Sequence, residues 1–184
     1  MGYSGLTLSP YSAAKSANAL KSQFCRAAHG LLEAVVHISR KSRYALRALV
    51  ELAERSEGAP DVPVRLADIA SARGISVQFL EQLFAALRRG GLLASQRGVA
   101  GGFVFARPPQ EISVLDVVEA LDGVIAPATC TAGEGECDRL GDCGAADVWF
   151  EAKYAVEDVL RRTSIADVAA RERATRARAA VPTA

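Results

Sequence analysis

The sequence has few aromatic residues and no long apolar run. Phe, Trp and Tyr make up 6% of its 184 residues, although half of the residues are hydrophobic. Because Ala, Leu and Val are abundant, this composition favours helices over strands. No apolar stretch reaches the roughly 18 residues that cross a bilayer. The N-terminus also lacks the basic segment and continuous apolar core of a secretory signal. We therefore expect a cytoplasmic protein with no membrane partner.

The groups from which most active sites are built are also scarce. The chain has two histidines, and no nucleophile–base pair or paired acids stand out on a predicted rigid element. The glycine-rich segment 98–102 lacks the Gly-Lys-Ser/Thr ending of a phosphate-binding loop. These absences favour a binding protein, and we predict that the protein is not an enzyme.

The net charge of +1 hides a strong asymmetry along the chain. Residues 36–107 hold eleven Lys or Arg against six Asp or Glu, a net of +5. Residues 108–160 hold two against twelve, a net of −10, and residues 161–184 hold six against two, a net of +4. The basic segment suits contact with a polyanion such as nucleic acid, whereas the acidic segment would be repelled by one.

Three helices are predicted after an N-terminal segment without clear periodicity. Residues 1–35 are rich in Ser and Ala, so we expect a poorly ordered extension with the folded domain starting directly after it. From Ser39 the pattern becomes helical, because apolar residues recur at three- and four-residue steps as far as Ala53. A short second helix (66–72), a turn at Gly74 and a third helix (76–89) complete a helix-turn-helix pattern.

The segment after the third helix predicts a wing. Short β-prone runs at 92–95 and 103–105 flank a turn that contains Gly98, Gly101 and Gly102, and this pattern is typical of a hairpin. A hairpin that directly follows a helix-turn-helix is the wing of a winged-helix domain. Two prolines then close the module.

The C-terminal half predicts further helices around an irregular loop. Ser113 and Asp116 form a capping pattern that begins a helix over 114–121. A loop over 123–144 follows, and then a longer helix over 147–162. The apolar stripe of this helix is wide enough to contact both its own domain and the same helix of a second copy. A last short helix and a fraying tail end the chain.

The expected fold class is therefore mainly α: a winged helix-turn-helix with a small β wing and a long C-terminal dimerisation helix. The expected regions are an extension (1–35), a DNA-binding domain (36–109), a cysteine loop with dimerisation helices (110–169) and a flexible tail (170–184).

These segments together resemble the Rrf-two family of bacterial winged-helix transcriptional regulators. The blocks that carry the resemblance are SRKSRYALRAL at 39–49, FLEQLF at 79–84, RGVAGGF at 97–103 and ISVLDVVEA at 112–120. A helix-turn-helix alone is weak evidence, but this ordered combination is specific. The resemblance implies a homodimer that binds a double-stranded DNA operator, and in the cluster-binding members an iron–sulfur cluster controls that binding.

A recognition helix reads base edges with its N-terminal residues in the major groove. The candidates at that end of the third helix are Ser76, Gln78, Phe79 and Glu81. Gln can pair with adenine, and Glu can accept from the amino group of cytosine. By resemblance, the base-reading positions of the family fall on these same four residues. Some members carry Ser and Tyr in place of Gln78 and Phe79, so we expect an operator of a different sequence.

Basic residues supply the other expected DNA contacts. Arg97 at the wing tip is placed to enter a minor groove, and the resemblance assigns the wing contact to the same residue. Three residues near the first helix are expected to hold phosphates: Arg40, Lys41 and Arg43. Two alternatives stay open: Phe79 belongs to the core, or the winged helix binds only protein or RNA.

Three of the four cysteines fall within fourteen residues: Cys130, Cys137 and Cys143. Cytoplasmic cysteines rarely form structural disulfides, so this grouping indicates a ligand set. Three thiolates on a glycine-containing loop can wrap one metal centre. Acidic residues interleave the cysteines and disfavour free thiolates, whereas bound iron stabilises them. By resemblance, cluster-binding family members carry three cysteines in this place, which implies an iron–sulfur cluster (2Fe-2S or 4Fe-4S).

The fourth ligand of such a cluster stays open. Some members place a His three residues after the last cysteine, where this chain has Ala146. Others take an Asp from the first helix of the partner, where this chain has Arg43. The remaining candidates are Glu134, Glu136, Asp138, Asp142, His37 and a small exogenous ligand. A zinc site or a thiol switch is the main alternative, although structural zinc usually takes four protein ligands at closer spacing.

Overall fold

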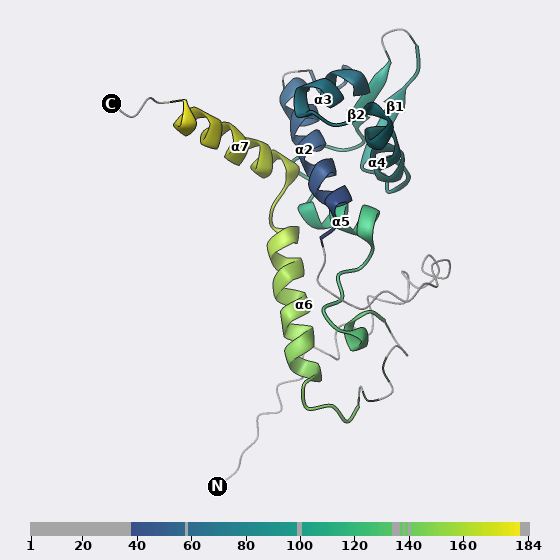
Figure 1. Cartoon of the computed structure of the whole chain (residues 1–184), viewed down its shortest axis with the longest axis vertical. Coiled ribbons are helices and arrows are strands. Elements are labelled where there is room, and N and C mark those ends of the chain that lie inside the picture. The colour runs from purple at the N-terminus through teal and green to yellow at the C-terminus, as the bar shows by residue number, and fades with distance from the viewer. Residues whose placement is uncertain are drawn as a thin grey trace. The chain divides into compact units, whose positions relative to one another are not determined.

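The computed structural model describes residues 38–57, 59–98, 101–133, 137, 139 and 141–180. The elements in this part of the chain are α2 (Arg40–Arg55), α3 (Leu66–Arg73), α4 (Val77–Arg89), β1 (Leu93–Gln96), β2 (Gly102–Phe105), α5 (Val114–Asp122), the 3-10 turn η1 (Thr129–Thr131), α6 (Ala146–Arg161) and α7 (Ile165–Ala179) (Figure 1). This order confirms the predicted fold class: mainly α, with a helix-turn-helix followed by a small antiparallel hairpin.

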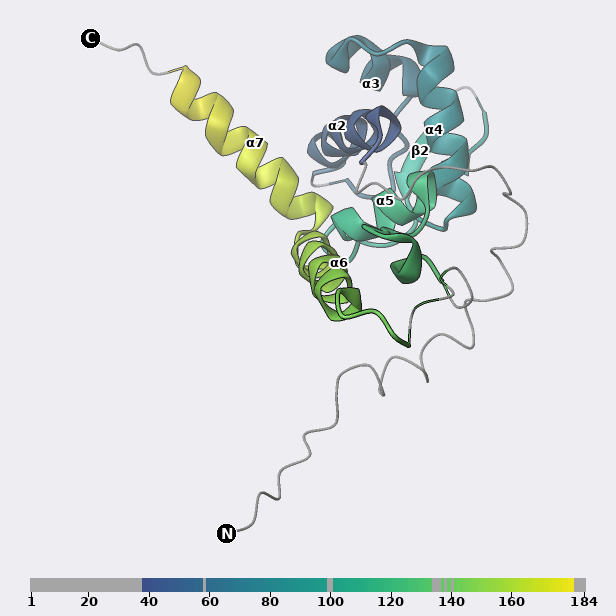
Figure 2. The ribbon, with the colours of Figure 1, turned by 60° about the horizontal axis from the view of Figure 1, so that its bottom comes forward.

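The three helices of the N-terminal half begin and end where local chemistry requires. Ser39 caps α2, and its side chain accepts a hydrogen bond from Ser42 N–H. The turn between α3 and α4 contains Gly74 at φ +62°, a left-handed conformation that side chains rarely adopt. Two residues later Ser76 caps α4. Helix α2 packs against α3, α4, α5 and α7 (Figure 2).

The hairpin is tied back to the loop before α3. Strands β1 and β2 pair antiparallel, with Leu93 opposite Phe105. Val64 adds a bridge to Phe103, because each residue donates its N–H to the carbonyl of the other at 3.0 and 2.9 Å. A Cβ atom on Gly102 would lie 2.3 Å from the carbonyl oxygen of Val64, so only glycine fits here. The base of the wing is therefore fixed to the helix-turn-helix.

One apolar core joins the N-terminal and C-terminal halves. Its largest fully buried side chains are Phe84, Leu49, Leu52, Ile69, Leu80, Leu87, Ile112 and Ile165. Ile165 opens α7, and its N–H donates to Ile112 C=O at 2.8 Å just before α5. The regions expected at 36–109 and 110–169 therefore share a core. The extension expected at 1–35 and residues 181–184 of the tail lie outside the described residues.

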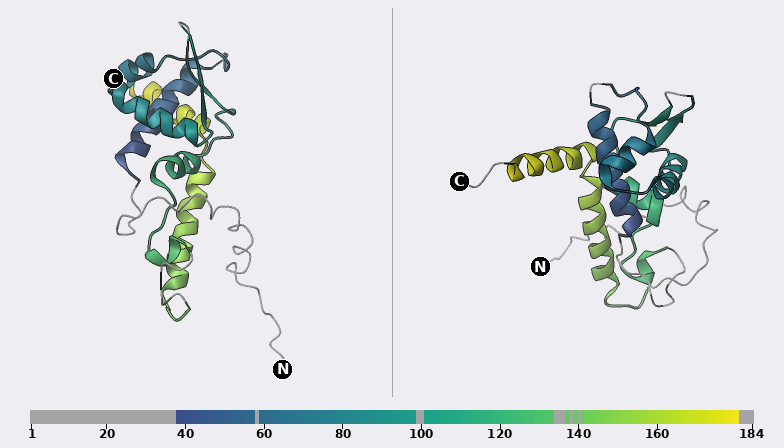
Figure 3. Two further views of the ribbon diagram at one scale, coloured as in Figure 1. Left: turned by 90° about the vertical axis from the view of Figure 1, so that its right-hand side faces the viewer. Right: turned by 45° about the horizontal axis from the view of Figure 1, so that its top comes forward.

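Helix α7 is longer than the sequence predicts. A Ser–Asp capping box at Ser164 and Asp167 begins it, as expected, but it runs to Ala179 through residues expected to fray. This corrects the expected boundary at 170. The physical reason is a set of ion pairs that hold α7 against α2 and the residues just after it: Arg176 pairs with Glu54 on α2, and Arg173 pairs with Glu57, two residues beyond the end of α2. Figure 3 shows α6 and α7 joined by a short bend.

Candidate DNA-binding surface and cysteine loop

Helix α4 divides into a buried face and an exposed face. Leu80, Leu83, Phe84 and Leu87 are buried. The three polar residues that the sequence nominates for base contacts are exposed: Ser76, Gln78 and Glu81. Ser76 has a second task, because its hydroxyl oxygen accepts a hydrogen bond from Phe79 N–H at 3.3 Å and caps the helix. The hydroxyl hydrogen of Ser76 is still free to serve an outside acceptor.

Phe79 is half-buried rather than free. Its ring packs against the core and meets the ring of Tyr44 edge-on, with ring centroids 5.7 Å apart. The guanidinium of Arg47 lies over the other ring of this pair, 5.6 Å from the Tyr44 centroid. The structure thus favours a packing role for Phe79, one of the two roles that the sequence leaves open.

The basic residues expected to contact DNA lie on α2 and in the hairpin. Arg40, Lys41, Arg43 and Arg97, which the sequence nominates, are all exposed. Arg47 was missed: it is exposed, and its Nη2 donates to Arg73 C=O at 3.2 Å, beside the turn that begins α4. The sequence offered one signal for it: Arg47 follows Arg43 by one helical turn and therefore lies on the same face of α2.

A pocket of about 380 Å³ lies between α4, the start of α3 and the hairpin. Its polar lining includes Arg65, Glu81, Arg88, Ser95 and Gln96. Arg88 Nη1 donates to Ser95 Oγ at 3.0 Å and so ties α4 to β1. The pocket brings Glu81 near two guanidinium groups that local sequence patterns did not single out.

The start of α2 is fixed by the end of α5. The carboxylate of Asp122 accepts hydrogen bonds from Ser39 N–H at 3.0 Å, Ser39 Oγ at 2.6 Å and Ser42 Oγ at 2.7 Å. Asp122 is the last residue of α5 and directly precedes the cysteine loop. The same carboxylate therefore connects the loop to the helix end that carries Arg40, Lys41 and Arg43.

The three clustered cysteines are free thiols in the structure. Cys130 and Cys137 are half-buried, and Cys143 is exposed. Cys130 lies in η1, which is held to α6 because Lys153 Nζ donates to Thr131 C=O at 2.8 Å. Cys143 lies at the other end of the loop, where its carbonyl accepts from Ala146 N–H at 3.1 Å as α6 begins. The backbone segments that carry two of the three thiols are therefore attached to the same helix.

The thiols do not share one site in this arrangement. Lys153 follows Ala146 by seven residues, so its attachment point lies about 10 Å along α6 from the start of that helix. Among the described residues, no three His, Cys, Asp or Glu side chains are grouped as a metal site. Of the fourth-ligand candidates, Asp142 is exposed. His37, Glu134, Glu136 and Asp138 lie outside the described residues.

The acidic loop precedes a helix with an exposed apolar face. On α6, Val148 is 58% exposed and Val159 is 55% exposed, whereas Val156 and Leu160 pack against α5. The wide stripe predicted for this helix thus divides into one side that packs on its own domain and one side that is mostly exposed. None of the helices in the described part of the chain is long and apolar enough to span a membrane.

Comparison with known proteins decides the family. The Rrf2 model, described as an iron-dependent transcriptional regulator, matches residues 38–171. The chain belongs to the Rrf2 family. This confirms the resemblance to Rrf-two regulators that the sequence motifs indicated.

Proteins similar to this Rrf2 protein are also transcriptional regulators. The HTH-type transcriptional regulator IscR of Photorhabdus laumondii is 33% identical over 146 residues, which cover 74% of this chain and 87% of the relative. CymR, the global cysteine regulator of B. subtilis, has a similar structure with a TM-score of 0.60 and 33% identity, covering 74% of this chain and 98% of CymR. IscR of T. potens has a TM-score of 0.57 and 31% identity, covering 80% and 93%. The protein is a DNA-binding transcriptional regulator and not an enzyme.

Proposed function

We propose that this Rrf2 protein is a homodimeric regulator whose operator binding is controlled by an iron–sulfur cluster on Cys130, Cys137 and Cys143. The observation that carries the proposal is the attachment of two cysteine segments to α6, through Lys153 and through the start of the helix. The same helix exposes an apolar face that suits a second copy. A change at the cysteines would therefore act on the helix that sets how two recognition helices are spaced on DNA.

The residues present fit such a cluster. Thiolates are the usual protein ligands of iron–sulfur clusters, and all three thiols are free and at least partly exposed. The description of the family as iron-dependent supports iron over other metals. When bound, the cluster would supply reactivity toward oxygen, nitric oxide or iron supply. Lys153 would hold the Cys130 segment on α6, and ligation would draw the three loop segments closer together.

For DNA, we assign base contacts to Ser76, Gln78 and Glu81, with Phe79 contributing at most its exposed edge. Arg97 is assigned to a minor groove, and Arg40, Lys41 and Arg43 to phosphates. The support is that these polar and basic side chains are exposed, on α4, on α2 and in the hairpin. Residues 170–179 of the expected tail are left out of the proposed DNA surface, because α7 packs on α2 near Glu54.

The cluster is tested on protein purified and reconstituted without air. We expect visible absorption and bound iron in the wild type, and loss of both in Cys130→Ala, Cys137→Ala and Cys143→Ala with the helical content unchanged. Cys25→Ala is the matched control, because it removes a cysteine outside the loop, and it should keep colour and iron. A colourless, iron-free wild type that binds its operator normally would contradict the proposal.

The DNA surface is tested by selecting operators from random duplexes. Gln78→Ala and Glu81→Ala should each relax the selected sequence at a single position. The binding free energy lost with each base contact should be about 1–3 kcal/mol. Arg43→Ala should weaken binding to all duplexes alike and lower the salt slope by about one. An unchanged sequence preference in both α4 variants would argue against α4 as the reading helix.

A zinc site or thiol switch is the second candidate. The separation of the cysteine segments favours the thiol switch of this pair, because it needs no metal, and no three ligands are grouped in the described part of the loop. Metal analysis of the purified protein, together with DNA binding in the presence of a chelator or a thiol oxidant, distinguishes this candidate from the cluster. Zinc without iron, or a response to oxidant without any metal, would select it.

A further inference from the structure

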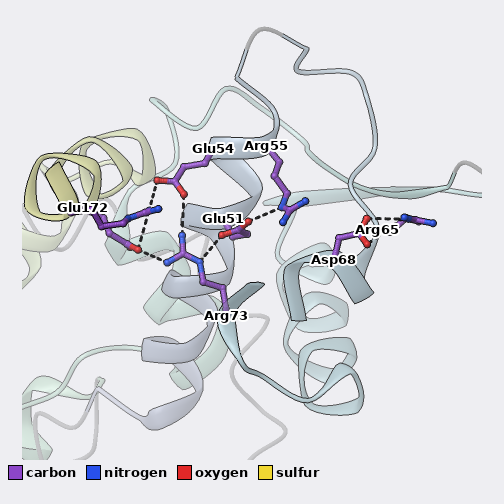
Figure 4. A network of polar contacts seen from close by, with 8 residues as sticks. Glu51, Glu54, Arg55, Arg65, Asp68, Arg73 and Glu172 are labelled. Carbon is purple, nitrogen blue, oxygen red and sulfur yellow. Dashed lines mark hydrogen bonds and ion pairs between the residues drawn. The ribbon is translucent and has the colours of Figure 1, made fainter. Parts of the chain in front are cut away.

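The guanidinium of Arg73 joins three carboxylates from two helices. Its Nε lies 2.8 Å from Glu51 Oε2 and its Nη2 lies 3.2 Å from Glu54 Oε2, both on α2. Its Nη1 pairs with Glu172 on α7. The Arg73 side chain is only 10% exposed, so this contact is largely shielded from water. Figure 4 shows Arg73 at the centre of the network.

The backbone of Arg73 lies at the turn of the helix-turn-helix. Arg73 is the last residue of α3, and Gly74 follows in the left-handed conformation. Its carbonyl accepts from Arg47 Nη2, so both ends of the residue are fixed. Helix α4 is capped only three residues later, at Ser76. A displacement of Arg73 therefore changes where the N-terminus of α4 lies.

Helix α7 is itself anchored at its start and along its length. Ile165 is fully buried, and its N–H donates to Ile112 C=O at 2.8 Å. Three turns further on, Arg176 Nη2 lies 2.5 Å from Glu54 and 3.1 Å from Glu172. The hydrogen bond to Glu54 raises the pKa of Arg176, so this cation keeps its charge. Glu172 is thus held between Arg73 and Arg176 and can fix the position of Arg73.

We propose that Arg73 is a positioning residue for operator recognition, and that α7 sets the position of α4 through the Glu172–Arg73 contact. The inference rests on the proposed role of α4 as the reading helix. It adds a determinant of specificity in α7, which packs on α2 beside Glu54 and itself carries none of the assigned DNA contacts.

Two variants test this on the full-length protein. Glu172→Gln keeps the shape of the side chain and removes its charge. Arg73→Lys keeps the net charge, but an ammonium group cannot reproduce the planar set of donors that meets three carboxylates. The probes are a duplex selected by the wild type and a scrambled duplex of equal length. We expect both variants to bind the selected duplex about five- to tenfold more weakly, a typical coupling between sites, and the scrambled duplex as the wild type does.

Glu57→Gln is the matched control. It also breaks an ion pair made by α7, but Glu57 lies two residues beyond the end of α2, is 67% exposed and pairs with Arg173 rather than with Arg73. It should bind both duplexes within twofold of the wild type. Hydrogen exchange of the free protein supplies an independent readout. Amides of segment 74–80 should exchange faster than in the wild type in Glu172→Gln and Arg73→Lys. Their exchange rates should be unchanged in Glu57→Gln.

The outcomes separate the two proposals. If both variants keep wild-type affinity for the selected duplex and wild-type exchange at 74–80, the inference is overturned. It is also overturned if they lose affinity equally for both duplexes, because this pattern indicates a general loss of charge or folding. If the wild type selects no duplex, the proposed reading surface fails, and the exchange measurement still decides whether α7 fixes the turn.

Discussion

Tyr44 on α2 and Phe79 on α4 meet edge-on, with their ring planes at 86°. The contact joins the first helix of the domain to the first turn of the helix that we expect to enter DNA. It explains why an aromatic residue stands among polar residues at this helix end: Phe79 fixes α4 on α2, while Gln78 and Glu81 face outward. Edge-on ring pairs add to the stabilisation that burial alone provides.

Phe79→Ala should therefore reduce stability as well as DNA binding. We expect the free energy of unfolding to fall by about 2 kcal/mol, less than for a fully buried Phe because part of the ring is exposed. The measurement is urea denaturation followed by circular dichroism. Gln78→Ala is the control on the exposed side of the same turn and should stay within about 0.5 kcal/mol of the wild type. Equal stability of the two variants would show that Phe79 has no packing role.

The sequence predicted those parts of the fold that local chemistry determines. Gly74, Ser76 and the pair Ser113–Asp116 mark turns and caps within a few residues of themselves, and the structure confirms each of them. The family blocks then identified the function at the level of a DNA-binding regulator.

The features that the sequence did not predict depend on contacts between distant residues. The extent of α7 depends on Arg176 meeting Glu54, which is 122 residues away in the chain. The buried network around Arg73 likewise joins residues 99 positions apart. No periodicity or spacing rule connects such residues, so a tail rich in Arg and Ala looks unstructured until α2 is present beside it.

The hydrogen bonds at Asp122 yield a prediction for the start of α2. Ser42 is fully buried, and its hydroxyl donates to the Asp122 carboxylate at 2.7 Å. Ser42→Ala should lower the free energy of unfolding by about 1–2 kcal/mol, as expected for a hydrogen bond to a charged group. Ser95→Ala removes a hydroxyl whose partner is the exposed Arg88, and its effect should be under about 0.5 kcal/mol. Thermal or urea unfolding measures the stability of both variants. If both lose a similar free energy of unfolding, the burial of Ser42 does not explain the importance of its hydrogen bond.

The start of α7 gives a pH-dependent prediction. Hydrogen bonds from the hydroxyl and the N–H of Ser164 lower the pKa of Asp167 below its ordinary value of 3.8. A lowered folded-state pKa means that the ionised form stabilises the fold above pH 3.8 and that this contribution disappears as the pH falls through the folded-state value. Asp167→Asn should thus melt below the wild type at pH 7, and the difference in melting temperature should shrink as the pH falls below 3.8. A gap that stays constant across this range would contradict the assignment.

The exposed face of α6 gives the last prediction. Val148, Ala155 and Val159 follow one another at seven- and four-residue steps, so they lie on one side of the helix, and all three are exposed. A regulator that reads two half-sites needs a second copy of the chain. The exposed apolar face lies on α6, the same helix to which the cysteine segments are attached. We expect Val159→Asp to weaken the dimer at least about a hundredfold, because an unpaired carboxylate in an apolar contact costs roughly 3 kcal/mol or more.

The matched control for the dimer is Val62→Asp, which introduces the same charge at a valine that is 60% exposed but lies in the loop before α3. Sedimentation velocity over a dilution series measures the monomer–dimer equilibrium of both variants. Val62→Asp should remain dimeric, and Val159→Asp should become monomeric and lose its preference for paired half-sites, since one recognition helix alone contacts half of an operator. A Val159→Asp protein that stays dimeric at the same dilution would move the subunit contact away from α6, and with it the link between the cysteine loop and the spacing of the two reading helices.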